Sequence, residues 1–192
     1  MTVFDTATRP PLPSRPRNGW QAWVATVGYM SLHHSPDAML KLRAFSSSAK
    51  TIGWESALTW GTSYEQVTDC ISLEMALQDL WQVAYPRHSI FKDMGILARA
   101  PIDYKDDQWI DESIRLTLDR ILKVTWSVFD TNWQLVIVYR PVERPEDRVQ
   151  ARLLAEDNMV LVGAKGATLL DALRLLFHRS ARIYTLKRDS NA

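Results

Sequence analysis

The chain has 192 residues, of which 46% are hydrophobic and 23% charged, and its formal net charge is +1. This composition is typical of a globular protein with one or two small domains, and it excludes a disordered chain and a strongly basic nucleic-acid or membrane binder. Because there is one cysteine, Cys70, and no apolar run near the roughly 20 residues of a membrane span, we expect a cytoplasmic protein without membrane contact.

The first part of the chain predicts a tail followed by three strands. Residues 1–19 contain prolines and arginines but no apolar run, which favours an extended tail over a signal peptide. Alternating apolar residues and a high content of Val, Thr and aromatic residues predict strands over 20–30, 39–45 and 51–60. Residues 61–69 are polar and are expected to form a loop.

A helix is predicted next, over residues 72–83. Its apolar residues fall at i, i+3, i+4, i+7 and i+8, which forms one stripe along a helix. Ser72 or Asp69 is expected to cap its N-terminus, and Pro86 to end it.

The second part predicts a linking helix, three strands and a last helix. The linking helix covers about 109–123, and the apolar run WQLVIVY at 133–139 predicts a central strand. The remaining predictions are strands over 148–155 and 159–164, a helix over 168–179 and a closing strand over 182–186.

These elements repeat in order and in part in sequence. SLEMALQDLW from Ser72 aligns without gaps with TLLDALRLLF from Thr168, so that Leu77 matches Leu173, and Trp23 is matched with Trp133 in the first strands. We therefore predict an α+β fold of two related β-β-β-α units, an internal duplication, with mainly antiparallel sheet and helices on one face. The predicted parts are a tail 1–19, a first unit 20–91, a linker 92–132, a second unit 133–186 and a basic C-terminal tail 187–192.

Four local patterns could carry chemistry, and each also has a plainer interpretation. They are the glycine-containing segment Gly163–Thr168 for an anion, His33 and His34 with Asp37 for a metal, Cys70 as a nucleophile, and the acidic residues of 103–112 for a cation or acid–base work. Turns, a small, partly buried cysteine and solvated acidic residues explain them better. We therefore predict no catalytic or metal-binding residue and no cofactor.

Two sets of residues are candidates for binding a partner. Trp54, Trp60 and Trp109 stand beside polar residues, and exposed tryptophans would mark an interface. Basic residues gather near the C-terminus, where they could meet a polyanion: Arg179, Arg182, Lys187 and Arg188.

The leading functional hypothesis is a non-enzymatic binding or assembly protein, a homodimer or a binder of another protein, that uses a sheet surface or a sheet edge. The alternative is a nucleic-acid-binding protein that uses its basic ends. A third hypothesis is a small enzyme with a site where the two units meet.

Overall fold

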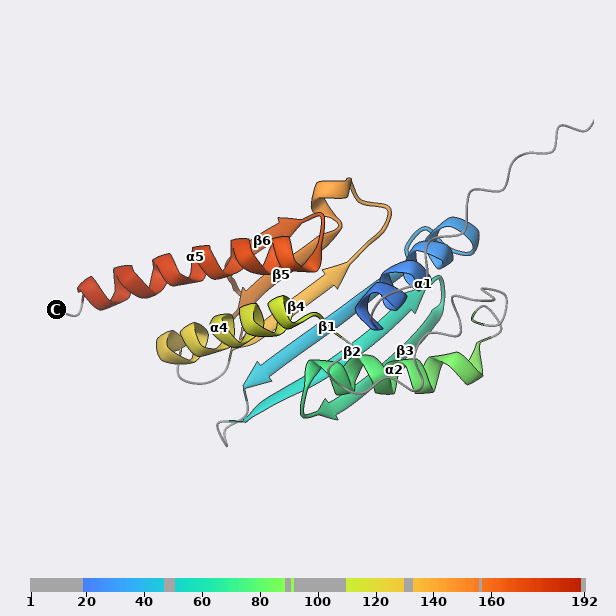
Figure 1. Ribbon diagram of the computed structural model, residues 1–192, viewed down its shortest axis with the longest axis horizontal. Helices are drawn as coiled ribbons and strands as arrows, with labels where there is room; N and C mark the ends of the chain where they lie inside the picture. The colour runs from blue at the N-terminus through green and yellow to red at the C-terminus, as the bar shows by residue number, and fades with distance from the viewer. Residues whose placement is uncertain are drawn as a thin grey trace, which may run out of the picture.

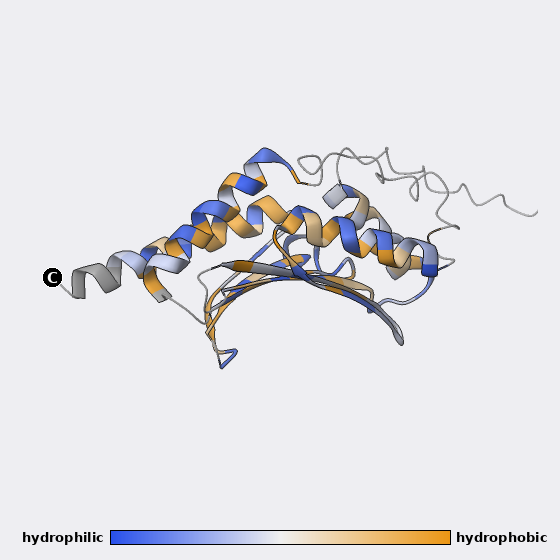
Figure 2. Cartoon of the chain, turned by 90° about the horizontal axis from the view of Figure 1, so that it is seen from below, coloured by the Kyte–Doolittle hydropathy of each residue, from blue (hydrophilic) through white to orange (hydrophobic). Residues whose placement is uncertain are grey.

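The computed structural model describes residues 19–46, 51–88, 91, 110–129, 133–155 and 157–190. These residues form a six-stranded antiparallel sheet in the order β3-β2-β1-β4-β5-β6. Helices α1, α2, α4 and α5 lie on one face of it (Figures 1 and 2). The predicted α+β class, with antiparallel sheet and helices on one face, is confirmed. The elements are α1 (Gly19–His33), β1 (Met39–Ser46), β2 (Ile52–Trp60), β3 (Ser63–Cys70), α2 (Leu73–Arg87), α4 (Glu112–Phe129), β4 (Gln134–Tyr139), the 3-10 turn η3 (Pro145–Asp147), β5 (Val149–Leu154), β6 (Val160–Gly166) and α5 (Leu169–Ser190).

The two halves of the chain meet at the centre of the sheet, where β1 pairs with β4. Leu42 lies opposite Ile137, and both side chains are fully buried beneath the helices. On either side each half continues as a meander, β1-β2-β3 and β4-β5-β6. The two predicted units therefore share one continuous sheet, and the core is the layer between that sheet and the helices.

The strand predicted over residues 20–30 is wrong, because this segment is helix α1. The alternation of Trp23, Val27 and Tyr29 suggested a strand. The large side chains that become buried are Trp20, Trp23, Val27 and Met30, spaced three, four and three apart, which is one face of a helix. Packing of this apolar helix face on the sheet outweighs the local β-propensity of the segment.

The loop predicted over residues 61–69 is also wrong, since most of it forms the edge strand β3. Trp60 pairs with Ser63, so only two residues turn the chain, and Gly61 adopts a φ of +54° that suits glycine there. The strand was missed because an edge strand with one solvent-exposed face contains few apolar residues.

Helices α2 and α5 extend further than their patterns predicted. Ser72 caps α2, with its hydroxyl oxygen accepting from the Met75 N–H at 3.1 Å, and α2 runs past Pro86 to Arg87. A proline in a final turn breaks only one helical hydrogen bond. Helix α5 continues through residues 182–186, predicted as a strand, and through 187–190, predicted as a tail, because Leu176 and Ile183 extend its apolar stripe.

The order helix, three strands, helix occurs twice, as α1-β1-β2-β3-α2 and α4-β4-β5-β6-α5. Leu77 and Leu173 are both fully buried in their helices, as the alignment of the two helices implies. The proposed match of Trp23 with Trp133 is wrong, because Trp23 lies in α1 and Trp133 precedes β4. The corresponding first strands are β1 and β4. This topology agrees with a duplication, which stays a prediction.

We predict that Leu77→Ala and Leu173→Ala each lower the free energy of unfolding by about 2–5 kcal/mol, because each leaves a cavity in a packed layer. Leu32→Ala is the matched control: Leu32 also lies in a helix but is 82% exposed, so the loss should stay within about 0.5 kcal/mol. Urea denaturation followed by circular dichroism measures all three. Equal losses at the three positions would contradict the assignment of the core.

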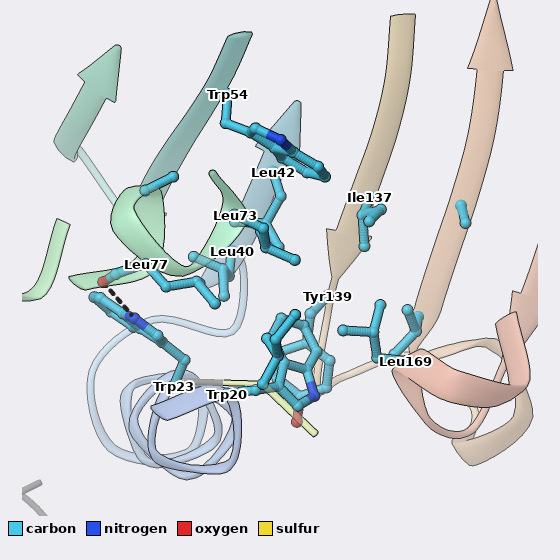
Figure 3. Packing of buried hydrophobic residues seen from close by; sticks show 14 of the residues in the cluster. Trp20, Trp23, Leu40, Leu42, Trp54, Leu73, Leu77, Ile137, Tyr139 and Leu169 are labelled. Atoms are coloured by element: carbon cyan, nitrogen blue, oxygen red, sulfur yellow. Dashed lines mark hydrogen bonds between the residues drawn. The ribbon is translucent and has the colours of Figure 1, made fainter. Parts of the chain in front are cut away.

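Helices α1 and α2 are joined by a buried hydrogen bond. The Trp23 indole N–H donates to the carbonyl oxygen of Leu77 at 3.1 Å (Figure 3). The Trp23 ring also meets the Trp81 ring edge-on, with ring centres 5.0 Å apart. Trp81 is equally buried, but its indole N–H has no hydrogen-bond partner among the described residues.

We therefore predict that Trp23→Phe destabilises the protein by about 0.5–1.5 kcal/mol more than Trp81→Phe does. Both changes remove the same volume from one cluster, so the difference isolates the hydrogen bond. Thermal or urea unfolding of the two variants gives this difference directly. A loss for Trp81→Phe that matches or exceeds the loss for Trp23→Phe would show that the bond contributes no net stability.

Candidate partner-binding face

The sheet has one face that no described helix covers. Figure 2 shows that the sheet arches, with its concave side turned away from the helices. Leu40, Leu42 and Ala44 of β1 are buried towards the helices, so the alternate residues point the other way. We call this surface the open face. Its side chains include Lys41, Arg43, Glu55, Ala57, Tyr64, Gln66, Val136, Val138, Arg140, Gln150, Arg152, Leu154 and Lys165.

A first hollow lies over the second half of the open face; we call it the β4–β6 hollow. Its volume is about 190 Å³. Four of its lining side chains are aliphatic, namely Val136, Val138, Leu154 and Val160, and four are polar or basic, namely Arg140, Gln150, Arg152 and Asn158.

Gln150 forms part of the wall of this hollow and is only 8% exposed. Its side-chain oxygen accepts a hydrogen bond from Nη2 of Arg152 at 3.0 Å. Asn158 turns the chain between β5 and β6 with a φ of +63°, in the left-handed region that asparagine tolerates. The polar wall is therefore set by the strand register and by a tight turn.

A second hollow, the β1–β3 hollow, lies over the first half and has a volume of about 130 Å³. It contains an ion pair: Nη2 of Arg43 lies 2.5 Å from Oε2 of Glu55, and Nε of Arg43 donates to the same oxygen at 2.8 Å. These residues are directly opposite on neighbouring strands. The guanidinium of this hollow is thus neutralised within the protein.

Basic side chains outnumber acidic ones on the open face. Among the side chains given above for this face, one is acidic, Glu55, and five are basic, namely Lys41, Arg43, Arg140, Arg152 and Lys165. Asp147 joins at the rim, where its carboxylate lies 3.4 Å from the Lys165 ammonium. The face therefore has a positive local charge although the whole chain is nearly neutral.

Two of the three tryptophans predicted as an interface, Trp54 and Trp60, are not on this face. Trp54 is 5% and Trp60 is 9% exposed, and both belong to the core under the helices. Trp109 lies outside the described residues. The side chains of Trp54 and Trp60 therefore stabilise the fold and leave little surface for a partner.

The basic C-terminal residues have separate environments. Nη1 of Arg179 donates to the carbonyl oxygen of Gly163 at the free edge of β6, so this guanidinium already has a structural role. Arg182 is exposed. Lys187 and Arg188 lie in the last turns of α5, and their side chains are outside the described part. Polyanion binding by these four residues stays a prediction.

The structure gives Cys70 the environment of a core residue. It is 2% exposed, and its Sγ lies 3.8 Å from Oδ2 of Asp79. Burial, and then the negative charge of Asp79, raise the pKa of the Cys70 thiol to about 11. Because the thiolate is the nucleophile, this thiol is unreactive at neutral pH.

The other sequence candidates are explained by local structure. The Asp37 carboxylate accepts hydrogen bonds from the Ser35 hydroxyl and from the Gly61 N–H, which lower the pKa of Asp37 and tie two turns together. Gly166 ends β6 so close to α5 that an added Cβ would lie 2.6 Å from the Ala172 nitrogen. Residues 103–109 of the acidic segment lie outside the described part.

Sequence reasoning missed a polar cluster that fastens the edge strand to α2. The Glu65 carboxylate lies 2.8 Å from Nε2 of His88 and 3.0 Å from Nη1 of Arg87. The His88 ring stands edge-on to Trp60, with centres 4.7 Å apart. It was missed because Glu65 belongs to the segment expected to be a loop.

The chain matches no family model, no curated protein and no solved structure. In the described ranges no group of three or more His, Cys, Asp and Glu side chains could hold a metal ion. No helix of those ranges is both long and apolar enough to cross a membrane.

We predict that native Cys70 is not alkylated by iodoacetamide at mildly alkaline pH and reacts fully once the protein is unfolded in urea. Its burial and its raised pKa both keep thiolate away from the reagent. Intact-protein mass spectrometry counts the adducts. Rapid labelling of the folded protein would show that the α2–β3 contact opens readily.

Proposed function

We propose that this protein is a non-enzymatic binding protein whose open face receives a partner protein. The observation that carries the proposal is the one-sided covering of the sheet. A concave surface that mixes aliphatic side chains with basic ones is left over after the helices have covered the other face. Such a mixture resembles the composition of interfaces, whose buried centres are apolar and in which arginine is enriched.

The state of the titratable groups favours binding over catalysis. Glu65, His88 and Arg87 hold the edge strand to α2, and Asp37 joins two turns. The Cys70 thiol is buried and protonated. Each of these groups has a structural partner, so none of them is poised to transfer a proton or attack a substrate.

A different protein suits the open face better than a second copy of this chain. Two copies placed face to face would bring two positively charged surfaces together, which costs free energy. The homodimer predicted from the sequence would then need another surface, such as the free edge of β3. Light scattering distinguishes these cases, because a mass of 22.0 kDa at micromolar concentration leaves the face open, whereas a doubled mass that is lost in Val138→Glu assigns it to a second copy.

The test places a photocrosslinking amino acid, p-benzoylphenylalanine, at Val138 on the open face or at Leu32 on the helix layer of the full chain, in the natural host. We expect a discrete crosslinked protein from position 138 and none from position 32. That protein is then purified, and its affinity is measured for the wild type, Val138→Glu and the matched control Leu32→Glu.

We expect Val138→Glu to weaken this affinity by about tenfold or more, because a carboxylate would be buried against the partner, and Leu32→Glu to leave it unchanged. Circular dichroism confirms that both variants are folded. An affinity unchanged in Val138→Glu, or crosslinks from position 32 alone, would overturn the proposal.

A further inference from the structure

We infer that the β4–β6 hollow receives an acidic side chain of the partner, set beside an aliphatic one, between the guanidinium groups of Arg140 and Arg152. This inference rests on the proposed function and specifies the chemistry of the partner. It predicts that the partner presents a segment in which Asp or Glu stands next to Leu, Ile or Val.

The polar side of the hollow is built for an anion. Arg140 and Arg152 bring two permanent positive charges to it, and no acidic residue lines it in the described part of the chain. The side-chain oxygen of Gln150 holds Nη2 of Arg152 at 3.0 Å, and Gln150 is itself more than nine-tenths buried. The Arg152 guanidinium is therefore oriented by a neutral group that leaves its charge uncompensated, and a carboxylate can bind it through charge-assisted hydrogen bonds.

In the β1–β3 hollow of the same sheet, the arginine has a carboxylate partner within the protein. There Glu55 accepts two contacts from Arg43, from Nη2 and from Nε. In the β4–β6 hollow the residue directly across from Arg152 on β4 is Val136, and the one on β6 is Gly163. Neither of these neighbours supplies a carboxylate, and no acidic side chain among the described residues lines the hollow, which leaves Arg152 able to bind an anion of a partner.

The apolar side of the hollow and its size point to a side chain rather than to a free ligand. Val138, Leu154 and Val160 give it an aliphatic wall, and Val160 is 52% exposed. A volume of about 190 Å³ is below the roughly 300–1,000 Å³ of pockets that enclose small molecules. It is large enough for one or two side chains of a docked segment.

A protein segment also fits better than a nucleic acid. Proteins that bind single strands stack bases on aromatic side chains, and none of the residues that line this hollow is aromatic. Phosphates would use the two arginines but leave the aliphatic wall uncovered. An acidic residue beside an aliphatic one satisfies both sides of the hollow.

The experiment selects short peptides from a random display library on the immobilised full chain. Selected peptides are labelled with fluorescein, and their affinity is measured by anisotropy for the wild type and for the double variant Arg140→Ala/Arg152→Ala. The matched control is Arg120→Ala/Arg174→Ala, which removes the same charge from exposed positions of α4 and α5. Single-stranded DNA is added as a competitor in a separate arm.

We expect the selected peptides to carry Asp or Glu beside an aliphatic residue. The affinity should fall by about tenfold or more in the open-face variant and stay unchanged in the control. Replacing the acidic residue with its amide, Glu→Gln, should weaken binding to the wild type by a similar factor.

Four outcomes would each overturn the inference. The selection could yield no peptide above background or peptides without a preference for acidic residues, the two double variants could lose affinity equally, or single-stranded DNA could displace the peptide. The proposed function fails separately, through the crosslinking comparison of positions 138 and 32. A partner that crosslinks at Val138 but binds the Arg140→Ala/Arg152→Ala variant normally would leave that function standing and refute this inference alone.

Discussion

The pairing of β1 with β4 is the contact on which the rest of the structure depends. Leu40 lies opposite Tyr139 and Leu42 opposite Ile137, so residues far apart in the chain form the middle of the sheet. A three-stranded meander with a helix on it buries little apolar surface alone. Joining two of them edge to edge removes two free edges and gives the four described helices one continuous floor.

Most of the large aromatic side chains of the described residues pack between the helices and the sheet. Trp23, Trp81 and Phe91 pack edge-on against one another where α1 crosses α2, and Trp126 meets Trp133 below α4. Edge-to-face contacts of this kind add to the free energy gained from area burial. The buried tryptophans of the described residues therefore fill a wide layer between the helices and the sheet.

The same one-sided packing leaves the opposite face of the sheet with a composition of its own. In β1 and β5 the residues that face the helices are aliphatic, whereas those on the open face include basic, amide and aliphatic side chains. The two hollows differ in one respect that matters for recognition. Glu55 compensates Arg43 in the first, and only the neutral Gln150 holds Arg152 in the second. Arg152 is exposed to solvent in the free protein, so its guanidinium is accessible to a complementary group of a partner.

The sequence alone was enough to identify the helices with a clean apolar stripe and the strands with clear alternation. The spacing of Leu73, Leu77 and Leu80 defined α2, and the apolar run ending in Tyr139 defined β4. It also indicated a repeated order of elements and an unreactive role for Cys70. These features depend on local periodicity and composition, which are read directly from neighbouring residues.

Only the tertiary structure decided the rest. Trp20–Met30 has the composition of a strand and became a helix, and the polar residues of β3 became a strand, because each segment is stabilised by what packs on it or pairs with it. Likewise, Arg43 and Arg152 look alike in sequence. Strand register alone places a carboxylate opposite the first and a valine and a glycine opposite the second, and that difference in long-range pairing separates a satisfied ion pair from a candidate binding site.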